Sequence, residues 1–171
     1  MQTDGLGQNL RAQALGAFLA RQGESLVTAE SCTGGLISAA LTSVAGSSAW
    51  FDRGWVTYTN QAKHEQLSVD LDSLQAFGAV SEQVVCEMAS GALMQAKRAA
   101  LSIAVSGVAG PGGGSAEKPV GLVWFGFARR MANDVVVSAV KQVFEGDRRA
   151  VREAAVEFAL SHALFLCEQS N

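Results

Sequence analysis

The sequence predicts one α/β domain over residues 1–171, with three layers (α/β/α) and a mixed β-sheet in the middle. Segments whose apolar residues recur at helical spacing alternate with short β-prone runs, a pattern typical of α/β folds. The uninterrupted apolar run at 101–105 indicates a strand that is buried on both faces. Two further β-prone runs, 120–128 and 135–143, flank a turn at Asn133-Asp134 and predict an antiparallel pair, so the sheet is expected to be mixed.

The first half of the chain alternates helices with short strands. Leu10, Ala14 and Ala17 have helical spacing, and Gly23 stands where that helix would end. A β-prone run then passes through a tight turn into a second apolar segment with helical spacing. These patterns predict, in chain order, a helix over 8–22, a strand over 25–29, a helix over 36–41, a strand over 55–59 and a short helix that begins at Asn60.

The second half of the chain is predicted to add three helices to the strands already described. Ser81, followed by Glu82 and Gln83, has the composition of a helix start. Apolar residues at helical spacing continue this segment and recur near the C-terminus. The predicted helices are a short one over 74–77, a longer one from 81 to about 98, and a last one over 147–167.

Composition and charge limit the classes of partner. The formal net charge of -3 argues against general nucleic-acid binding, which usually needs a basic surface. No segment approaches the ~20 apolar residues of a membrane-spanning helix. Cys32, Cys86 and Cys167 are far apart and odd in number, which suits free thiols in a reducing cytoplasm. No His/Cys/Asp/Glu cluster has the spacing of metal ligands, so we expect no metal, no nucleic acid and no membrane.

A candidate nucleophile, Ser31, lies between the first strand and the second helix, in Thr28-Ala29-Glu30-Ser31-Cys32-Thr33-Gly34-Gly35. Backbone N–H groups at the start of the following helix are expected to point toward a serine at such a corner. There they can hold the oxyanion that forms when a carbonyl is attacked. Gly34 and Gly35 would let a substrate approach the backbone closely. Two alternatives stay open: Ser31 is only a helix N-cap, or Cys32 is the nucleophile.

A candidate base for this serine lies in Tyr58-Thr59-Asn60-Gln61-Ala62-Lys63. A serine hydroxyl is a weak nucleophile until a base takes its proton. The two histidines, His64 and His162, stand in no recognisable triad context. Lys63 can serve instead if burial lowers its pKa, and Tyr58 could orient the amine or relay a proton. The alternative is that Lys63 is an ordinary solvated helix residue.

A glycine-dense loop follows the buried strand: Ser106-Gly107-Val108-Ala109-Gly110-Pro111-Gly112-Gly113-Gly114-Ser115. Consecutive N–H groups in such a loop can converge on a phosphate. The loop is not a P-loop, because Lys118 stands between Glu117 and Pro119 rather than in a Gly-Lys-Ser/Thr sequence. The alternative is a mobile surface loop without a ligand.

Together these segments resemble the C-terminal domain family of the competence-damage-inducible protein CinA. The resemblance continues through Lys118-Pro119-Val120-Gly121 and Phe144-Glu145-Gly146-Asp147-Arg148, and so spans nearly the whole chain. It implies hydrolysis of the carboxamide of nicotinamide mononucleotide to nicotinic acid mononucleotide and ammonia. That reaction belongs to pyridine nucleotide salvage and is implied to need neither a metal nor an organic cofactor.

The resemblance also implies roles for individual residues. Ser31 becomes the nucleophile, Lys63 its base and Tyr58 a residue that supports them. Arg148 becomes a substrate contact, although it can also be understood as an exposed residue in the first turn of the last helix. The residues expected to bind substrate are Thr33, Gly34, Gly35, Asn60, Ser106, Gly107, Gly110, Gly112, Gly113 and Arg148.

The alternative function is a non-catalytic nucleotide-binding module linked to competence or to the DNA-damage response. A further expectation concerns association of the chain with itself. Trp50-Phe51 and Trp55 stand close to Tyr58 and could form an apolar contact surface between subunits, or could be ordinary core residues. The resemblance favours a homo-oligomer.

Overall fold

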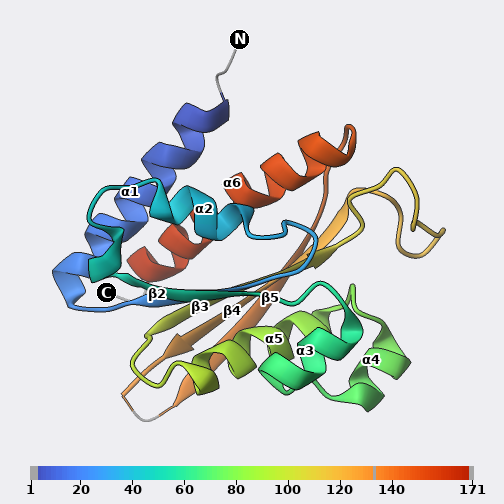
Figure 1. The fold of residues 1–171 in the computed structure, drawn as a ribbon, viewed down its shortest axis with the longest axis horizontal. Coiled ribbons are helices and arrows are strands. Elements are labelled where there is room, and N and C mark those ends of the chain that lie inside the picture. The colour runs from blue at the N-terminus through green and yellow to red at the C-terminus, as the bar shows by residue number, and fades with distance from the viewer. Residues whose placement is uncertain (1–3, 133, 170–171) are drawn as a thin grey trace.

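The structure, a computed structural model, describes residues 4–132 and 134–169 as a sheet between two layers of helices (Figure 1). No helix within these residues is long and apolar enough to cross a membrane. The elements in chain order are α1 (Asp4–Gln22), β1 (Leu26–Glu30), α2 (Leu36–Thr42), the 3₁₀ turn η1 (Ser47–Ala49), β2 (Phe51–Val56), α3 (Asn60–Leu67), α4 (Leu71–Phe77), α5 (Glu82–Gln95), β3 (Leu101–Gly107), β4 (Leu122–Arg130), β5 (Val135–Val143) and α6 (Arg148–Gln169).

The five strands form one mixed sheet in the order β2-β1-β3-β4-β5. β1 pairs in parallel with β2 and β3, whereas the pairs β3–β4 and β4–β5 are antiparallel. α1, α2 and α6 cover one face, and α3, α4 and α5 cover the other (Figure 1). The predicted α/β/α fold and its mixed sheet are confirmed. The last two strands pair as expected, although Asn133 in the predicted turn lies outside the described residues.

The second strand differs most from its prediction, because it covers Phe51–Val56 rather than 55–59. The strand ends before Thr59, because Thr59 is the N-cap of α3: its Oγ1 accepts the N–H of Ala62 at 3.1 Å. A cap of this kind satisfies one of the N–H groups that the first turn of a helix leaves without an intrahelical partner. The helix itself begins at Asn60 as predicted.

The sheet separates two apolar cores. One lies beneath α1, α2 and α6 and includes Leu15, Ile103 and Phe125, while the other lies beneath α5 and includes Val84 and Met88. Burial of apolar surface is the main favourable term in folding, so both faces of the sheet contribute to its stability. The strand ends that carry the polar motifs therefore project from a rigid frame.

Trp50 belongs to the first core and does not form an exposed contact surface. Its side chain is 4% exposed and lies against Gly16 of α1, where an added Cβ would come within 2.4 Å of the indole ring. Phe51 and Trp55 are partly buried and pack against the first and the second core, respectively. The core alternative therefore holds for Trp50, whereas Phe51 and Trp55 keep part of their surface exposed on the edge strand β2, and the contact surface stays a prediction. The homo-oligomer stays a prediction.

The parallel arrangement of β1, β2 and β3 brings three polar segments to one end of the sheet. Ser31 follows β1, Thr57 and Tyr58 follow β2, and the glycine-dense loop follows β3. The carboxyl ends of parallel strands in α/β sheets are common positions for ligand sites.

Candidate active site

Ser31 lies at the first position after β1, with its side chain almost fully buried. Its backbone N–H donates to the carbonyl of Val105 at 3.0 Å, which continues the pairing of β1 with β3. Ser31 is not the N-cap of α2, because Gly35 takes that position with φ 99° and offers no side-chain cap. A glycine suits this left-handed conformation, which side-chain-bearing residues rarely adopt.

The start of α2 is capped by the carboxylate of Glu30, which precedes Ser31 in the chain and is fully buried. Glu30 was not among the expected site residues, because only the folded structure shows where its carboxylate points. Its two oxygens accept five hydrogen bonds: from Thr33 Oγ1 at 2.7 Å, Gly35 N at 3.0 Å, Ile37 N at 3.0 Å, Ser38 N at 2.8 Å and Ser38 Oγ at 2.7 Å.

The expected oxyanion donors must therefore be corrected. Gly35, Ile37 and Ser38 direct their N–H groups at Glu30, not at Ser31. In the described part of the chain, no other residue accepts the backbone N–H of Cys32 or of Thr33. The donors near the serine are thus the N–H groups of the turn and not those of the helix.

Lys63 on α3 is 1% exposed, and its amine lies 2.9 Å from the Ser31 hydroxyl oxygen. The same Nζ donates to the carbonyl of Thr57 at 2.8 Å and to that of Tyr58 at 3.4 Å. Burial lowers the pKa of Lys63 from 10.5 to about 8, an effect that the neighbouring Cys32 partly offsets. The solvated-lysine alternative does not fit these contacts, because a buried ammonium is penalised and the neutral amine is favoured.

Tyr58 contacts Lys63 through its backbone carbonyl, while its phenol points elsewhere. The phenol oxygen accepts a hydrogen bond from Arg148 Nη2 at 2.8 Å, and Arg148 Nη1 donates to the carbonyl of Gly110 at 2.8 Å. One guanidinium therefore connects the segment after β2 with the glycine-dense loop.

Cys32, beside the serine, is buried, and burial is the main reason that its pKa rises from 9.0 to about 11. A thiol with such a pKa stays protonated near neutral pH, and the thiolate is the nucleophilic form. The raised pKa of its thiol therefore counts against Cys32 as the attacking group.

A cavity of about 210 Å³ brings the candidate residues together. Ala79 and Val80, between α4 and α5, were not expected in the site, and small apolar residues in a linker give no sequence signal of such a role. The residues that line this cavity are Ser31, Cys32, Tyr58, Lys63, Ala79, Val80, Ser106, Gly107, Ala109 and Arg148.

A larger, more open pocket of about 620 Å³ adjoins this cavity and shares Ala109 and Arg148 with it. Its other lining residues come from the glycine-dense loop, from the segment just before β4, from the end of the β5–α6 connection and from the start of α6. Arg152 in its wall was not expected in the site either, and a helix arginine gives no signal of such a role. The remaining lining residues are Gly110, Pro111, Val120, Gly146, Asp147, Arg149 and Arg152.

Several expected substrate contacts line neither hollow. The Thr33 hydroxyl is turned to Glu30, and Asn60 is exposed at the start of α3. Gly112 and Gly113 lie in the exposed part of their loop, where a Cβ on Gly112 would meet no atom within 4 Å. Gly34 and Gly35 shape the turn instead, both with positive φ. The glycine-dense loop thus reaches the two hollows through its first half.

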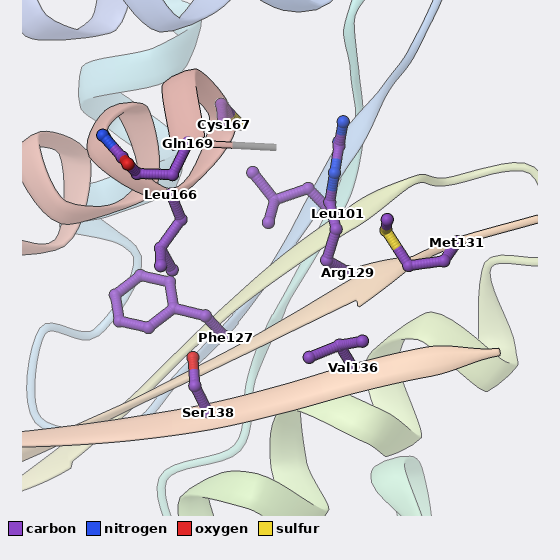
Figure 2. Close-up of a pocket in the computed structure, with 9 residues that line it drawn as sticks. All are labelled: Leu101, Phe127, Arg129, Met131, Val136, Ser138, Leu166, Cys167 and Gln169. Carbon is purple, nitrogen blue, oxygen red and sulfur yellow. The ribbon is translucent and has the colours of Figure 1, made fainter. Parts of the chain in front are cut away.

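A third cavity, of about 180 Å³, lies at the other end of β3, beside Leu101. Figure 2 shows it between β4, β5 and the last turn of α6, with Arg129 next to Leu101. Arg129 forms an ion pair with Glu24, with Nη1 and Oε2 2.7 Å apart. Apart from Arg129, the lining of this third cavity is largely apolar, and it does not include Ser31 or Lys63. Within the described residues, no group of three or more His, Cys, Asp and Glu side chains could hold a metal ion.

Known proteins resemble this chain over nearly its full length. Residues 8–166 match the model of the CinA C-terminal domain. The chain is 59% identical over 150 residues to the nicotinamide-nucleotide amidohydrolase PncC of Enterobacter agglomerans, which covers 88% of this chain and 89% of the relative. It is 49% identical to the PncC of Escherichia coli strain K12, over 87% and 88% of the two chains. The crystal structure of a competence/damage-inducible protein from Agrobacterium tumefaciens superposes with a TM-score of 0.86 at 45% identity, over 95% and 96%.

Proposed function

Since the chain belongs to the CinA C-terminal domain family, we propose that it hydrolyses the carboxamide of nicotinamide mononucleotide to nicotinic acid mononucleotide and ammonia. The observation that carries the proposal is the 2.9 Å contact between the Ser31 hydroxyl and the buried amine of Lys63. Relatives as similar as 59% carry the name of this amidohydrolase, which supports the substrate.

In this proposal the neutral Lys63 amine is the general base. A neutral amine has two N–H donors and one lone pair. The carbonyls of Thr57 and Tyr58 accept from the amine, which leaves the lone pair for the hydroxyl proton of Ser31. The serine oxygen bonds to the carboxamide carbon as Lys63 takes this proton, and Lys63 returns it to the nitrogen that leaves as ammonia. Water then attacks the ester, and Lys63 again accepts and returns a proton.

Negative charge on the former carboxamide oxygen needs donors that are already in place. The N–H groups of Cys32 and Thr33 are assigned this role, since no other residue in the described part of the chain accepts them. Preorganised donors of this kind cost no reorganisation when the charge develops.

The adjoining pocket is assigned to the ribose phosphate. Arg148 lines both hollows, so a substrate that spans them would pass this guanidinium. A guanidinium binds phosphate oxygens with charge-assisted hydrogen bonds. Asp147 caps the start of α6 by accepting the N–H of Ala150 at 2.9 Å, so the attraction for phosphate is assigned to Arg148 rather than to the helix end.

Ammonia release from nicotinamide mononucleotide by the purified chain tests the proposal directly. Turnover that disappears in a Ser31→Ala variant and persists in Cys32→Ala would support it. Tight binding of the mononucleotide without ammonia release would instead support the nucleotide-binding module. Activity that is lost on treatment with iodoacetamide but kept in Ser31→Ala would indicate a cysteine hydrolase.

A further inference from the structure

We propose that Glu30 and Arg152 are positioning residues that hold the turn after Ser31 from its two sides and so aim the backbone N–H of Cys32 at the carbonyl under attack. The inference rests on the proposed function for the identity of the substrate. The positioning role itself is inferred from the hydrogen bonds of residues 31–35, which form this turn.

Arg152 holds the carbonyl side of the turn. From α6 its Nε donates to the carbonyl of Cys32 at 3.1 Å, and its Nη2 donates to that of Thr33 at 2.9 Å. Two donors of one planar guanidinium fix two successive peptide groups, which a lysine could not do with the same geometry. Because α6 packs on α1 and α2, this anchor belongs to the helical layer and not to the turn itself.

The effect of Arg152 passes along the peptide groups to the residue after the nucleophile. In a trans peptide the C=O and the following N–H point in opposite directions. With the Thr33 carbonyl held by Arg152, the N–H of Gly34 points away from it and donates to the carbonyl of Ser31 at 3.0 Å. That bond fixes the carbonyl of Ser31 and so orients the peptide group between Ser31 and Cys32, whose N–H belongs to Cys32. Cys32 lines the cavity beside Ser31.

Glu30 holds the N–H side of the same turn. Its oxygens take the N–H of Gly35 and the hydroxyl of Thr33, besides the three donors of Ile37 and Ser38 on α2. The Glu30 backbone is paired with Val56 on one side and Val105 on the other, so the carboxylate extends from the middle of the sheet. An N-cap usually satisfies one backbone N–H of the first turn, whereas this carboxylate accepts three backbone N–H groups and two hydroxyls.

Together the two residues leave no peptide group of the turn free to rotate. The peptides after Cys32 and Thr33 are held by Arg152, and the one after Gly34 is held by Glu30. The peptide after Ser31 is held by the N–H of Gly34. Donors fixed in this way meet the requirement for oxyanion stabilisation, because their direction does not have to be found during the reaction.

Steady-state kinetics of Arg152→Gln separate this role from phosphate binding by the same side chain. We expect kcat to fall about tenfold to a hundredfold, somewhat less than the roughly 10² to 10³ that removal of one oxyanion donor costs. The fall should be equal for nicotinamide mononucleotide and for nicotinamide riboside, which lacks the phosphate. A phosphate contact predicts a higher KM for the mononucleotide only, and that result would overturn the inference. Arg11→Gln is the matched control, since Arg11 pairs with Glu157 on α6 and touches no atom of the turn.

A second measurement does not depend on the proposed substrate. A fluorophosphonate reacts with an activated serine: an O–P bond forms, fluoride leaves, and the serine proton goes to Lys63. The phosphoryl oxygen then occupies the position of the oxyanion. We expect Glu30→Gln and Arg152→Gln to slow labelling of Ser31, followed by mass spectrometry, about tenfold or more, while Arg11→Gln labels at the parent rate.

The outcomes distinguish the two proposals. A parent chain that is labelled but releases no ammonia from the mononucleotide refutes the proposed substrate only, and the labelling rates still test the positioning role. Labelling of Arg152→Gln at the parent rate overturns the positioning role, whatever the substrate is. A parent chain that is not labelled at Ser31 overturns it as well. If Glu30→Gln does not fold, Arg152→Gln alone decides.

Discussion

The protonation of Lys63 gives the most quantitative prediction. Burial lowers its pKa from 10.5 to about 8, and only the neutral amine can accept the serine proton. At pH 7 about one tenth of the molecules then carry a neutral amine, against about one in 3,000 at the ordinary pKa. The buried position of this lysine therefore raises the fraction of competent base about 300-fold at pH 7.

The sign of the pH dependence follows from the lowered pKa of a base that acts unprotonated. We expect kcat/KM for ammonia release to rise about tenfold per pH unit below pH 8 and to level off above it. Lys63→Arg should be as inactive as Lys63→Ala, because a guanidinium stays protonated throughout this range. Lys97→Arg, at an exposed turn, is the control and should keep the parent profile.

A titration of the amine itself checks the assignment. The ¹³Cε resonance of Lys63 in a Ser31→Ala variant should change with a midpoint well below 10.5, the ordinary pKa of a lysine. A profile of kcat/KM that is flat between pH 6 and pH 9, or an active Lys63→Arg variant, would refute the reasoning. Either result would show that the residue supplies charge only.

Three further predictions concern the nucleophile, the phosphate and the packing of α5. Ser31→Ala should lower turnover by about 10⁶, as losses of hydrolase nucleophiles do, while Cys32→Ala keeps most activity; an ammonia assay decides between them. Arg148→Gln should raise KM for the mononucleotide about tenfold to a hundredfold and leave the riboside almost unaffected, since one charge-assisted hydrogen bond of about 1.5–3 kcal/mol is lost; equal effects on both substrates would count against it. Gly91→Ala should lower the free energy of unfolding in urea by about 1–3 kcal/mol, because the added Cβ would lie 1.9 Å from a carbonyl of α3. Gly112→Ala is the control and should be close to neutral, because a Cβ there meets no atom within 4 Å.

The sequence by itself determined the features that depend on neighbouring residues. The start of α3 at Asn60 was predictable, and the structure explains it through the capping hydroxyl of Thr59. The buried strand at 101–105 followed from its apolar run, and β3 contains it. Apolar spacing, caps and turns are short-range effects of sterics and hydrogen bonding, so they are visible in one stretch of chain. The candidate residues Ser31 and Lys63 came from motifs of the same local kind.

Only the tertiary structure decided which of these residues meet. Ser31 and Lys63 are 32 positions apart, and the parallel pairing of Glu30 with Val56 brings the segment after β2 beside the serine. The phenol of Tyr58 turned out to contact Arg148, 90 positions away. The inward direction of Glu30 and the two bonds of Arg152 to the turn likewise depend on strand register and helix packing. The lowered pKa of Lys63 has the same origin, because burial is a property of the whole fold and no local pattern encodes it.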